Sequence, residues 1–156
     1  MRKLENLIPP PAVLLLTLVA MFFISRFDQT RVLKADNFSL NTLLATTLVI
    51  SGIAIAILGI KQFRKSDTTV NPLRPDTASN LVTSGVFTLT RNPMYLGMLL
   101  ISLSSVAFYG SVWCLTAVAA FMAFITRFQI IPEERAMASL FGKEYDAYKA
   151  STRRWI

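Results

Sequence analysis

The sequence predicts an all-α, multi-pass membrane protein with four transmembrane helices and a cytoplasmic C-terminal helical segment. Hydrophobic residues make up 53% of the chain and charged residues only 16%, whereas soluble domains carry about 25% charged residues. Charges are absent from three stretches, residues 6–25, 37–60 and 92–126, which contain 20, 24 and 35 residues. Because 156 residues is an ordinary domain size, we expect a single domain over residues 1–156.

These uncharged stretches set the expected helices in order. A bilayer core about 30 Å thick needs roughly 20 helical residues at about 1.5 Å each, so the first two stretches fit one crossing each. The third is long enough for two antiparallel crossings, and Tyr-Gly-Ser at residues 109–111 favours a tight turn between them. The helices are therefore predicted at about residues 7–25, 38–60, 93–108 and 112–131.

The start of the chain is read as a retained helix. Arg2 and Lys3 precede the first apolar stretch as in a signal peptide, but no small-x-small cleavage pattern follows it. Three prolines at residues 9–11 are compatible with a helix only at its entrance, where the first N–H groups lack partners.

The basic residues predict the orientation. With the N-terminus inside, thirteen of the 16 Lys and Arg residues lie on the cytoplasmic side, as the positive-inside rule prefers. Both termini are then cytoplasmic, and the protein is expected in the cell membrane. The net charge of +7 favours membrane lipids with anionic headgroups over nucleic acid, because the basic residues flank apolar spans.

The composition excludes several kinds of site. The chain has no His and one Cys, Cys114, which removes His-based acid–base catalysis, Cys–His nucleophiles and nearly all transition-metal sites. There is no P-loop and no G-x-G-x-x-G motif. We therefore predict no metal and no Rossmann-type nucleotide site.

Polar sequence is gathered in two blocks, residues 61–91 and 132–156, which the topology places on one side of the membrane. Arg-Asn-Pro-Met-Tyr-Leu-Gly at residues 91–97 enters the third helix, and Pro-Glu-Glu at residues 132–134 leaves the fourth. Each motif also has a structural explanation: helix capping, acidic residues at a helix N-terminus, or a small residue for close helix packing. Together, however, they place ionisable groups beside lipid, where such groups are costly and typically functional.

The ordered pair of motifs resembles the isoprenylcysteine carboxyl methyltransferase family and the related phosphatidylethanolamine N-methyltransferases. The resemblance covers about residues 68–156 and includes Phe-Gly-Lys-Glu-Tyr at residues 141–145. It implies a helical membrane fold that binds S-adenosylmethionine at the cytoplasmic ends of the last two helices, under the C-terminal segment. The residues that it implies for this cofactor are Arg91, Asn92, Pro93, Tyr95, Leu96, Gly97, Glu133 and Glu134.

One position departs from the family, because the eukaryotic members carry His where this chain has Asn92. A role that needs an imidazole therefore does not transfer, although Asn can donate and accept hydrogen bonds. In our interpretation one carboxylate of the pair Glu133 and Glu134 binds the amino group of the cofactor, Glu134 also being a candidate catalytic residue. Tyr95 would border the adenosine or the sulfonium.

The methyl acceptor stays open at this point. A sulfonium and a carboxylate lose charge together during transfer, which favours O-methylation of a lipophilic or lipid-modified carboxylate in a dry site. Arg127 is then the candidate for holding that carboxylate by a bidentate bond. N-methylation of an amine is possible if a carboxylate removes the proton. Asn71 and Arg74, in the long loop before the third helix, are candidate substrate-binding residues.

Two other functions compete with this hypothesis. Membrane sterol reductases have similar Arg-x-Pro-x-Tyr-x-Gly and Glu-Glu elements but bind NADPH, so a lipid-directed reductase is an alternative by analogy. A non-enzymatic small membrane protein is the other, with the polar motifs serving only as caps and anchors. The sequence does not indicate the oligomeric state.

Overall fold

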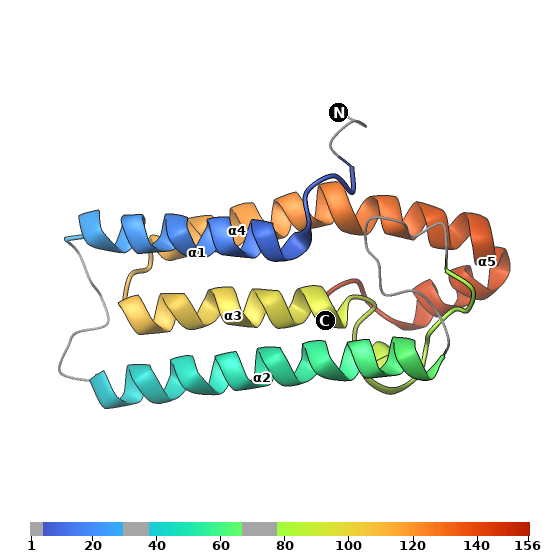
Figure 1. The fold of residues 1–156 in the computed structure, drawn as a ribbon, viewed down its shortest axis with the longest axis horizontal. Coiled ribbons are helices and arrows are strands. Elements are labelled where there is room, and N and C mark those ends of the chain that lie inside the picture. The colour runs from blue at the N-terminus through green and yellow to red at the C-terminus, as the bar shows by residue number, and fades with distance from the viewer. Residues whose placement is uncertain (1–4, 30–37, 67–77) are drawn as a thin grey trace.

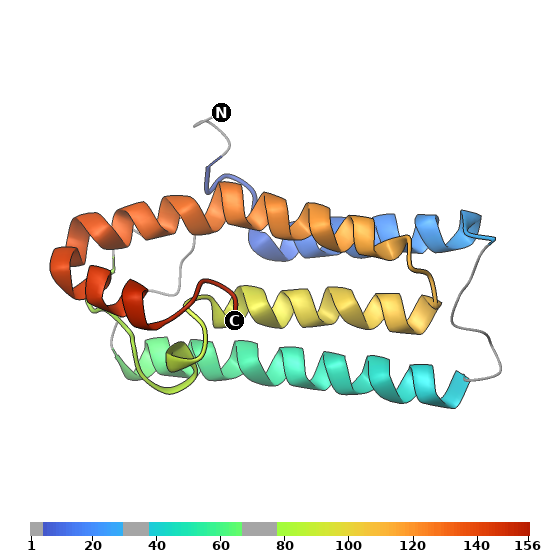
Figure 2. The same ribbon diagram turned by 180° about the vertical axis from the view of Figure 1, so that it is seen from behind.

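The computed structural model is a helical bundle and describes residues 5–29, 38–66 and 78–156. These residues form helices and connecting turns without a strand, which confirms the predicted all-α class. Figures 1 and 2 show α1 and α4 side by side, α3 along the middle of the bundle and α2 on its other side. The helix α3 packs against α1, α2 and α4, and therefore forms the centre of the fold.

Helix α2 begins at the predicted residue, whereas α1 begins three residues later than the predicted start at residue 7. Helix α1, Pro10–Phe27, starts at the second proline of the triplet, with prolines in its first turn, where missing N–H groups cost no hydrogen bond. Helix α2, Phe38–Lys65, runs five residues beyond the predicted end. This added turn places Phe63 edge-on against Phe87, with ring centroids 5.0 Å apart. The extra length of α2 thus supports the loop that leads into α3.

The predicted hairpin joins the next two helices. Helix α3, Pro93–Tyr109, ends at Gly110, whose φ of 65° gives the left-handed cap that commonly ends helices. Helix α4, Cys114–Ile125, follows and continues through a π-helical turn, η5, Thr126–Ile130, into α5, Ile131–Ser151. The helix therefore continues past residue 131, where the predicted fourth crossing ends, and runs without a break to the kink at Gly142.

The continuity has a physical cause at Pro132. Proline offers no N–H and crowds the carbonyl four residues earlier, so it normally kinks or breaks a helix. Here the wide turn of η5 directly precedes the proline, and such bulges accommodate irregularities within helices. The carbonyl of Phe128, which Pro132 cannot serve, accepts a 3.0 Å hydrogen bond from the backbone N–H of Asn6. The described residues before α1, residues 5–9, are called the N-terminal segment, and this segment thus completes the hydrogen bonding of the turn.

Three helical runs of the described chain are long and apolar enough to cross a membrane: Pro10–Phe27, Ser39–Lys65 and Cys114–Ser151. Helix α3 is apolar but shorter, with 17 residues, so the fourth crossing stays a prediction. The outer surfaces of α1 and α2 expose large aliphatic and aromatic side chains, as expected of surfaces that face lipid. Those more than half exposed are Leu15, Leu16, Phe23, Phe27, Leu40, Leu43, Ile50 and Leu58.

Glycines bring α2 and α3 into backbone contact. A Cβ atom added at Gly52 would lie 2.6 Å from the carbonyl oxygen of Gly97, and one at Gly97 would meet the carbonyl of Gly52. Small residues at such crossings allow close packing between membrane helices. A Cβ atom added at Gly59 would similarly lie 3.1 Å from the ring of Pro93. The position of the start of α3 is therefore fixed by α2.

The C-terminal half of α5 turns back over one end of the bundle (Figures 1 and 2). The turn occurs at Gly142, with φ of 49° and ψ of −122°, a conformation that glycine adopts without steric cost. Beyond it, Tyr145 and Tyr148 are buried in a second hydrophobic cluster with Val82 and Phe87. The short 3-10 helix η4, Gly85–Thr88, supplies Phe87 to this cluster. The turned-back segment therefore has its own apolar support.

We predict that Gly52→Val destabilises the bundle by about 1–3 kcal/mol, the usual cost of overpacking, because its side chain would enter the backbone of α3. The melting temperature of the detergent-purified protein measures this effect. Ala54→Leu adds the same number of carbons on the exposed face of α2 and should change the melting temperature little. Equal melting temperatures for the two variants would contradict the close α2–α3 contact.

Candidate functional site

The carboxylate of Glu134 lies at the centre of a polar cluster at the end of the bundle where α3 begins. Arg91, just before α3, donates through a terminal nitrogen to Oε1 at 2.7 Å. Arg154, from the C-terminal tail, donates through Nε to Oε1 at 3.0 Å and through a terminal nitrogen to Oε2 at 2.7 Å. This fork-shaped pairing is the strong, directional form of the arginine–carboxylate bond. Glu134 therefore joins three segments that are distant in the sequence.

Arg91 also binds backbone carbonyl groups of the C-terminal segment, residues 143–156. Its guanidinium donates to the carbonyl oxygens of Lys149, at 3.1 Å, and Thr152, at 2.6 Å. Its backbone N–H donates to the carbonyl of Arg153 at 3.0 Å. The Arg91 side chain is 10% exposed, and its buried Nε has no hydrogen-bond partner among the described residues. Arg91 thus serves as a fixed anchor that retains one free donor.

Residues on either side of Arg91 complete this attachment. The side-chain amide of Asn92 donates to the carbonyl of Arg154 at 2.8 Å, and the Thr90 hydroxyl donates to the same oxygen at 3.3 Å. Asn92 occupies the position before α3, but its side chain makes no capping hydrogen bond to that helix. Asn92 is therefore the N-cap residue of α3, as expected, but its side-chain amide binds the C-terminal tail instead of the helix.

Tyr95 and Glu133 form a second, more buried pair beside this cluster. The Tyr95 side chain, from the first turn of α3, is 4% exposed, so it does not belong to an aromatic belt at the membrane surface. Its hydroxyl donates to Oε1 of Glu133. Glu133 and Glu134 lie within a continuous helical run rather than at a free helix start. Their charges are consequently met by these side chains and not by a helix dipole.

The cluster leaves positive charge near its exposed edge. The Arg154 side chain is 37% exposed, against 17% for Glu134. The hydrogen bond with Glu134 raises the pKa of Arg154 above its usual value, so this guanidinium stays charged. With Arg91, two guanidiniums face one carboxylate in the ion-paired part of the cluster. The arrangement is suited to a ligand that carries a negative group near Arg154.

The other predicted cofactor residues are placed beside this cluster by helix packing. Pro93 and Gly97 contact α2, and Leu96, 7% exposed, belongs to the main hydrophobic core. These contacts provide a structural role for all three residues. Whether any of them also touches a cofactor stays a prediction.

Arg127 lies in a different cluster from Glu134. It pairs with Glu5 at 3.0 Å, and Arg135 pairs with the second oxygen of the same carboxylate. The hydrogen bond from Arg127 lowers the pKa of Glu5 below its usual value, with Arg135 contributing in the same direction against desolvation. A substrate carboxylate at Arg127 would therefore compete with Glu5. Asn71 and Arg74 lie outside the described residues.

Sequence reasoning missed Arg154 and the carbonyl groups that surround Arg91. From the sequence, residues 143–156 suit an interfacial anchor or a cofactor lid, and neither interpretation gives Arg154 a partner. The pairing of Arg154 with Glu134 depends on the turn at Gly142, which determines where residues 143–156 lie. The consecutive arginines close to Trp155 were the available signal, but either one fits a lipid-facing role equally well.

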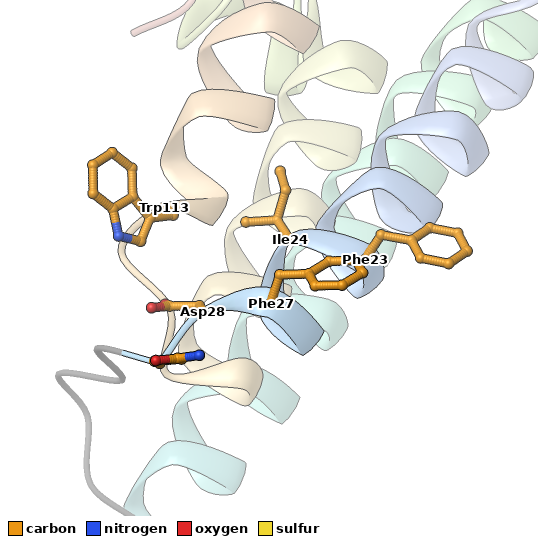
Figure 3. A pocket seen from close by; sticks show the side chains of 6 residues that line it. Phe23, Ile24, Phe27, Asp28 and Trp113 are labelled. Carbon is orange, nitrogen blue, oxygen red and sulfur yellow. The ribbon is translucent and has the colours of Figure 1, made fainter.

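A hollow of about 610 Å³ lies at the opposite end of the bundle, between the end of α1 and the start of α4 (Figure 3). It is wide open and lined by Phe23, Phe27 and Trp113, with Asp28 as its acidic group. The Asp28 carboxylate accepts a hydrogen bond from Ser111. The described residues contain no group of His, Cys, Asp and Glu side chains that could hold a metal ion. The buried cluster around Glu133 and Glu134 is therefore the stronger candidate site.

Comparisons with known proteins give two matches. The family model described as phospholipid methyltransferase matches residues 40–144, which include α2, α3, α4 and both motifs at residues 91–97 and 132–134. An uncharacterized protein of Haemophilus influenzae is 41% identical over 63 residues, which are 40% of this chain and 100% of that protein. No solved structure matches the chain. The matched range begins and ends earlier than the predicted resemblance over residues 68–156.

We predict that Arg91→Gln releases the C-terminal segment, because it removes one partner from a largely buried ion pair, at a cost of about 3 kcal/mol. Amide hydrogen exchange of residues 143–154 should accelerate by about a hundredfold. Arg153→Gln is the matched control, since that exposed side chain makes none of the described contacts with Glu134. Similar exchange in the two variants would contradict the anchoring role of Arg91.

Proposed function

The chain belongs to the phospholipid methyltransferase family, and from this premise we propose that it is a membrane methyltransferase that uses S-adenosylmethionine. The observation that carries the proposal is the buried cluster of Tyr95, Glu133 and Glu134 beneath the C-terminal segment. Ionisable groups at such a depth beside lipid are costly and typically serve function. We place this end of the bundle, and both termini, on the cytoplasmic side of the cell membrane, where the cofactor is made.

The two carboxylates are assigned different tasks. Glu134 already receives both guanidiniums, so in this proposal it positions Arg91 and Arg154. The described partner of Glu133 is the neutral hydroxyl of Tyr95, and this carboxyl is the better candidate for the amino group of the cofactor. The exposed edge of Arg154 is suited to the carboxylate of the same methionine moiety. Both ends of that moiety would then find an opposite charge.

Methyl transfer from a sulfonium is an in-line displacement, so the chain must chiefly align donor and acceptor and exclude water. Tyr95 and the C-terminal segment restrict access of water to the cluster. A carboxylate acceptor is favoured, because its charge and that of the sulfonium disappear together in the transition state. An amine acceptor would need a base, for which Glu133 is the nearest buried carboxylate.

The acceptor is proposed to be lipophilic and to arrive from the bilayer. The cluster lies next to helices whose outer faces are apolar, and a substrate with a hydrocarbon tail can reach it laterally. These features support a lipophilic substrate without indicating its identity.

We predict that the detergent-purified protein binds S-adenosylmethionine in calorimetric titration and that Glu133→Gln weakens binding by about 1.5–3 kcal/mol. This is the usual contribution of a hydrogen bond to a charged group. Glu144→Gln is the control, because it makes the same change at an exposed position of the same helix and should leave the affinity unchanged.

The same titration with NADPH separates the competing functions. Binding of NADPH without S-adenosylmethionine would favour a lipid-directed reductase and refute the proposal. Binding of neither cofactor would favour a non-enzymatic membrane protein. If S-adenosylmethionine binds, transfer of its labelled methyl group to a membrane lipid extract tests the reaction itself.

A further inference from the structure

The N-terminal segment binds the outer face of the helical run formed by α4, η5 and α5. Besides the backbone bond from Asn6 to Phe128, the side-chain amide of Gln129 donates to the carbonyl of Ile8 at 2.8 Å. Gln129 is fully buried, so this contact is part of the fold. Together the two bonds fix where Glu5 lies.

Glu5 joins two arginines that are eight residues apart. One carboxylate oxygen contacts Arg127 at 3.0 Å and the other contacts Arg135. Their Cα atoms are separated by about 12 Å along the helix, and the two long side chains converge on the same carboxylate. The two guanidiniums therefore converge on one anionic group, the Glu5 carboxylate.

The cluster of Glu5, Arg127 and Arg135 has a net positive charge, and its arginines are accessible. Two guanidiniums face one carboxylate, and each guanidinium has five N–H donors, of which one is used in the described contacts. The Arg127 and Arg135 side chains are 39% and 51% exposed, whereas Glu5 is 12% exposed. Further donors can thus reach an external anion while Glu5 lies behind them.

The surroundings are those of a lipid headgroup rather than of a soluble anion. Arg127 lies where the apolar part of the helical run gives way to the charged residues after Pro132. The Phe128 ring lies 5.4 Å from its guanidinium and packs against Phe124. Leu7, next to the N-terminal segment, is 61% exposed. Apolar surface for an acyl chain therefore adjoins the cations, and arginine at this level faces phosphate.

We propose that Arg127 and Arg135 form a binding site for the phosphate of an anionic membrane lipid, and that Glu5 competes for it as an internal carboxylate. The site is separate from the cluster at Glu134, and it does not depend on the proposed methyl transfer. Binding of the lipid would replace the contacts of Glu5 on the outer face of the helix. The local lipid composition would then control how firmly the N-terminal segment is held.

The test is titration of the full-length protein, in detergent, with short-chain phosphatidylglycerol, followed by native mass spectrometry. Phosphatidylcholine of the same chain length and inorganic phosphate serve as separate probes, because one has a neutralised phosphate and the other has no acyl chain. We expect preference for phosphatidylglycerol over both. Glu5→Gln should raise its affinity by about fivefold and Arg135→Gln should lower it by about fivefold, the effect of one charge near an anionic lipid.

Arg153→Gln removes one exposed positive charge elsewhere and should leave the affinity unchanged. Arg135 is preferred to Arg127 for the deletion because it is half exposed and its loss spares the contact with Phe128, so the variant should fold. The proposal fails if Arg135→Gln behaves like Arg153→Gln, or if Glu5→Gln does not exceed the wild type. Equal binding of inorganic phosphate and phosphatidylglycerol would show a soluble-anion site and would also overturn it.

Discussion

The pairing of Glu134 with two guanidiniums is the interaction on which the candidate site depends. Arg91 holds the carboxylate from the start of α3, and Arg154 holds it from the C-terminal tail. A lone carboxylate at this depth would be strongly unfavourable, whereas the paired group satisfies its partners. The same Arg91 side chain binds carbonyl groups of the C-terminal segment. It therefore positions both the Glu134 carboxylate and the backbone of that segment. Removal of either arginine would loosen the C-terminal segment that covers Tyr95.

The geometry of that cluster is set by features of the helices around it. Close contact between Gly52 and Gly97 fixes the start of α3 against α2. The π-helical turn before Pro132 lets the helix continue, which delivers Glu133 and Glu134 to α3 without a loop. Gly142 then reverses the chain. Each of these structural features is local, but together they bring residues 91, 134 and 154 to one place.

Much of the fold follows from the sequence, because uncharged stretches and prolines are local signals. The helix starts at Phe38 and Pro93 and the turn at Gly110 agree with prediction, and α1 starts within the predicted proline triplet. Arg91 and Glu134 were expected to lie close, since the topology brings both polar blocks to one end. The partner of Arg127 and the role of Arg154 were not predictable. Both depend on how the ends of the chain return to the bundle, and this is decided by long-range packing.

The most direct test is hydrogen exchange of the detergent-purified protein with and without S-adenosylmethionine. The account predicts slower exchange in residues 91–97, 132–137 and 143–154 when the cofactor is present, with no change near Trp113. Protection confined to the hollow beside Phe27 and Trp113 would place the ligand at the wrong end of the bundle. Unchanged exchange throughout, at cofactor concentrations that saturate related methyltransferases, would contradict the assignment of the cluster around Glu134 as the cofactor site.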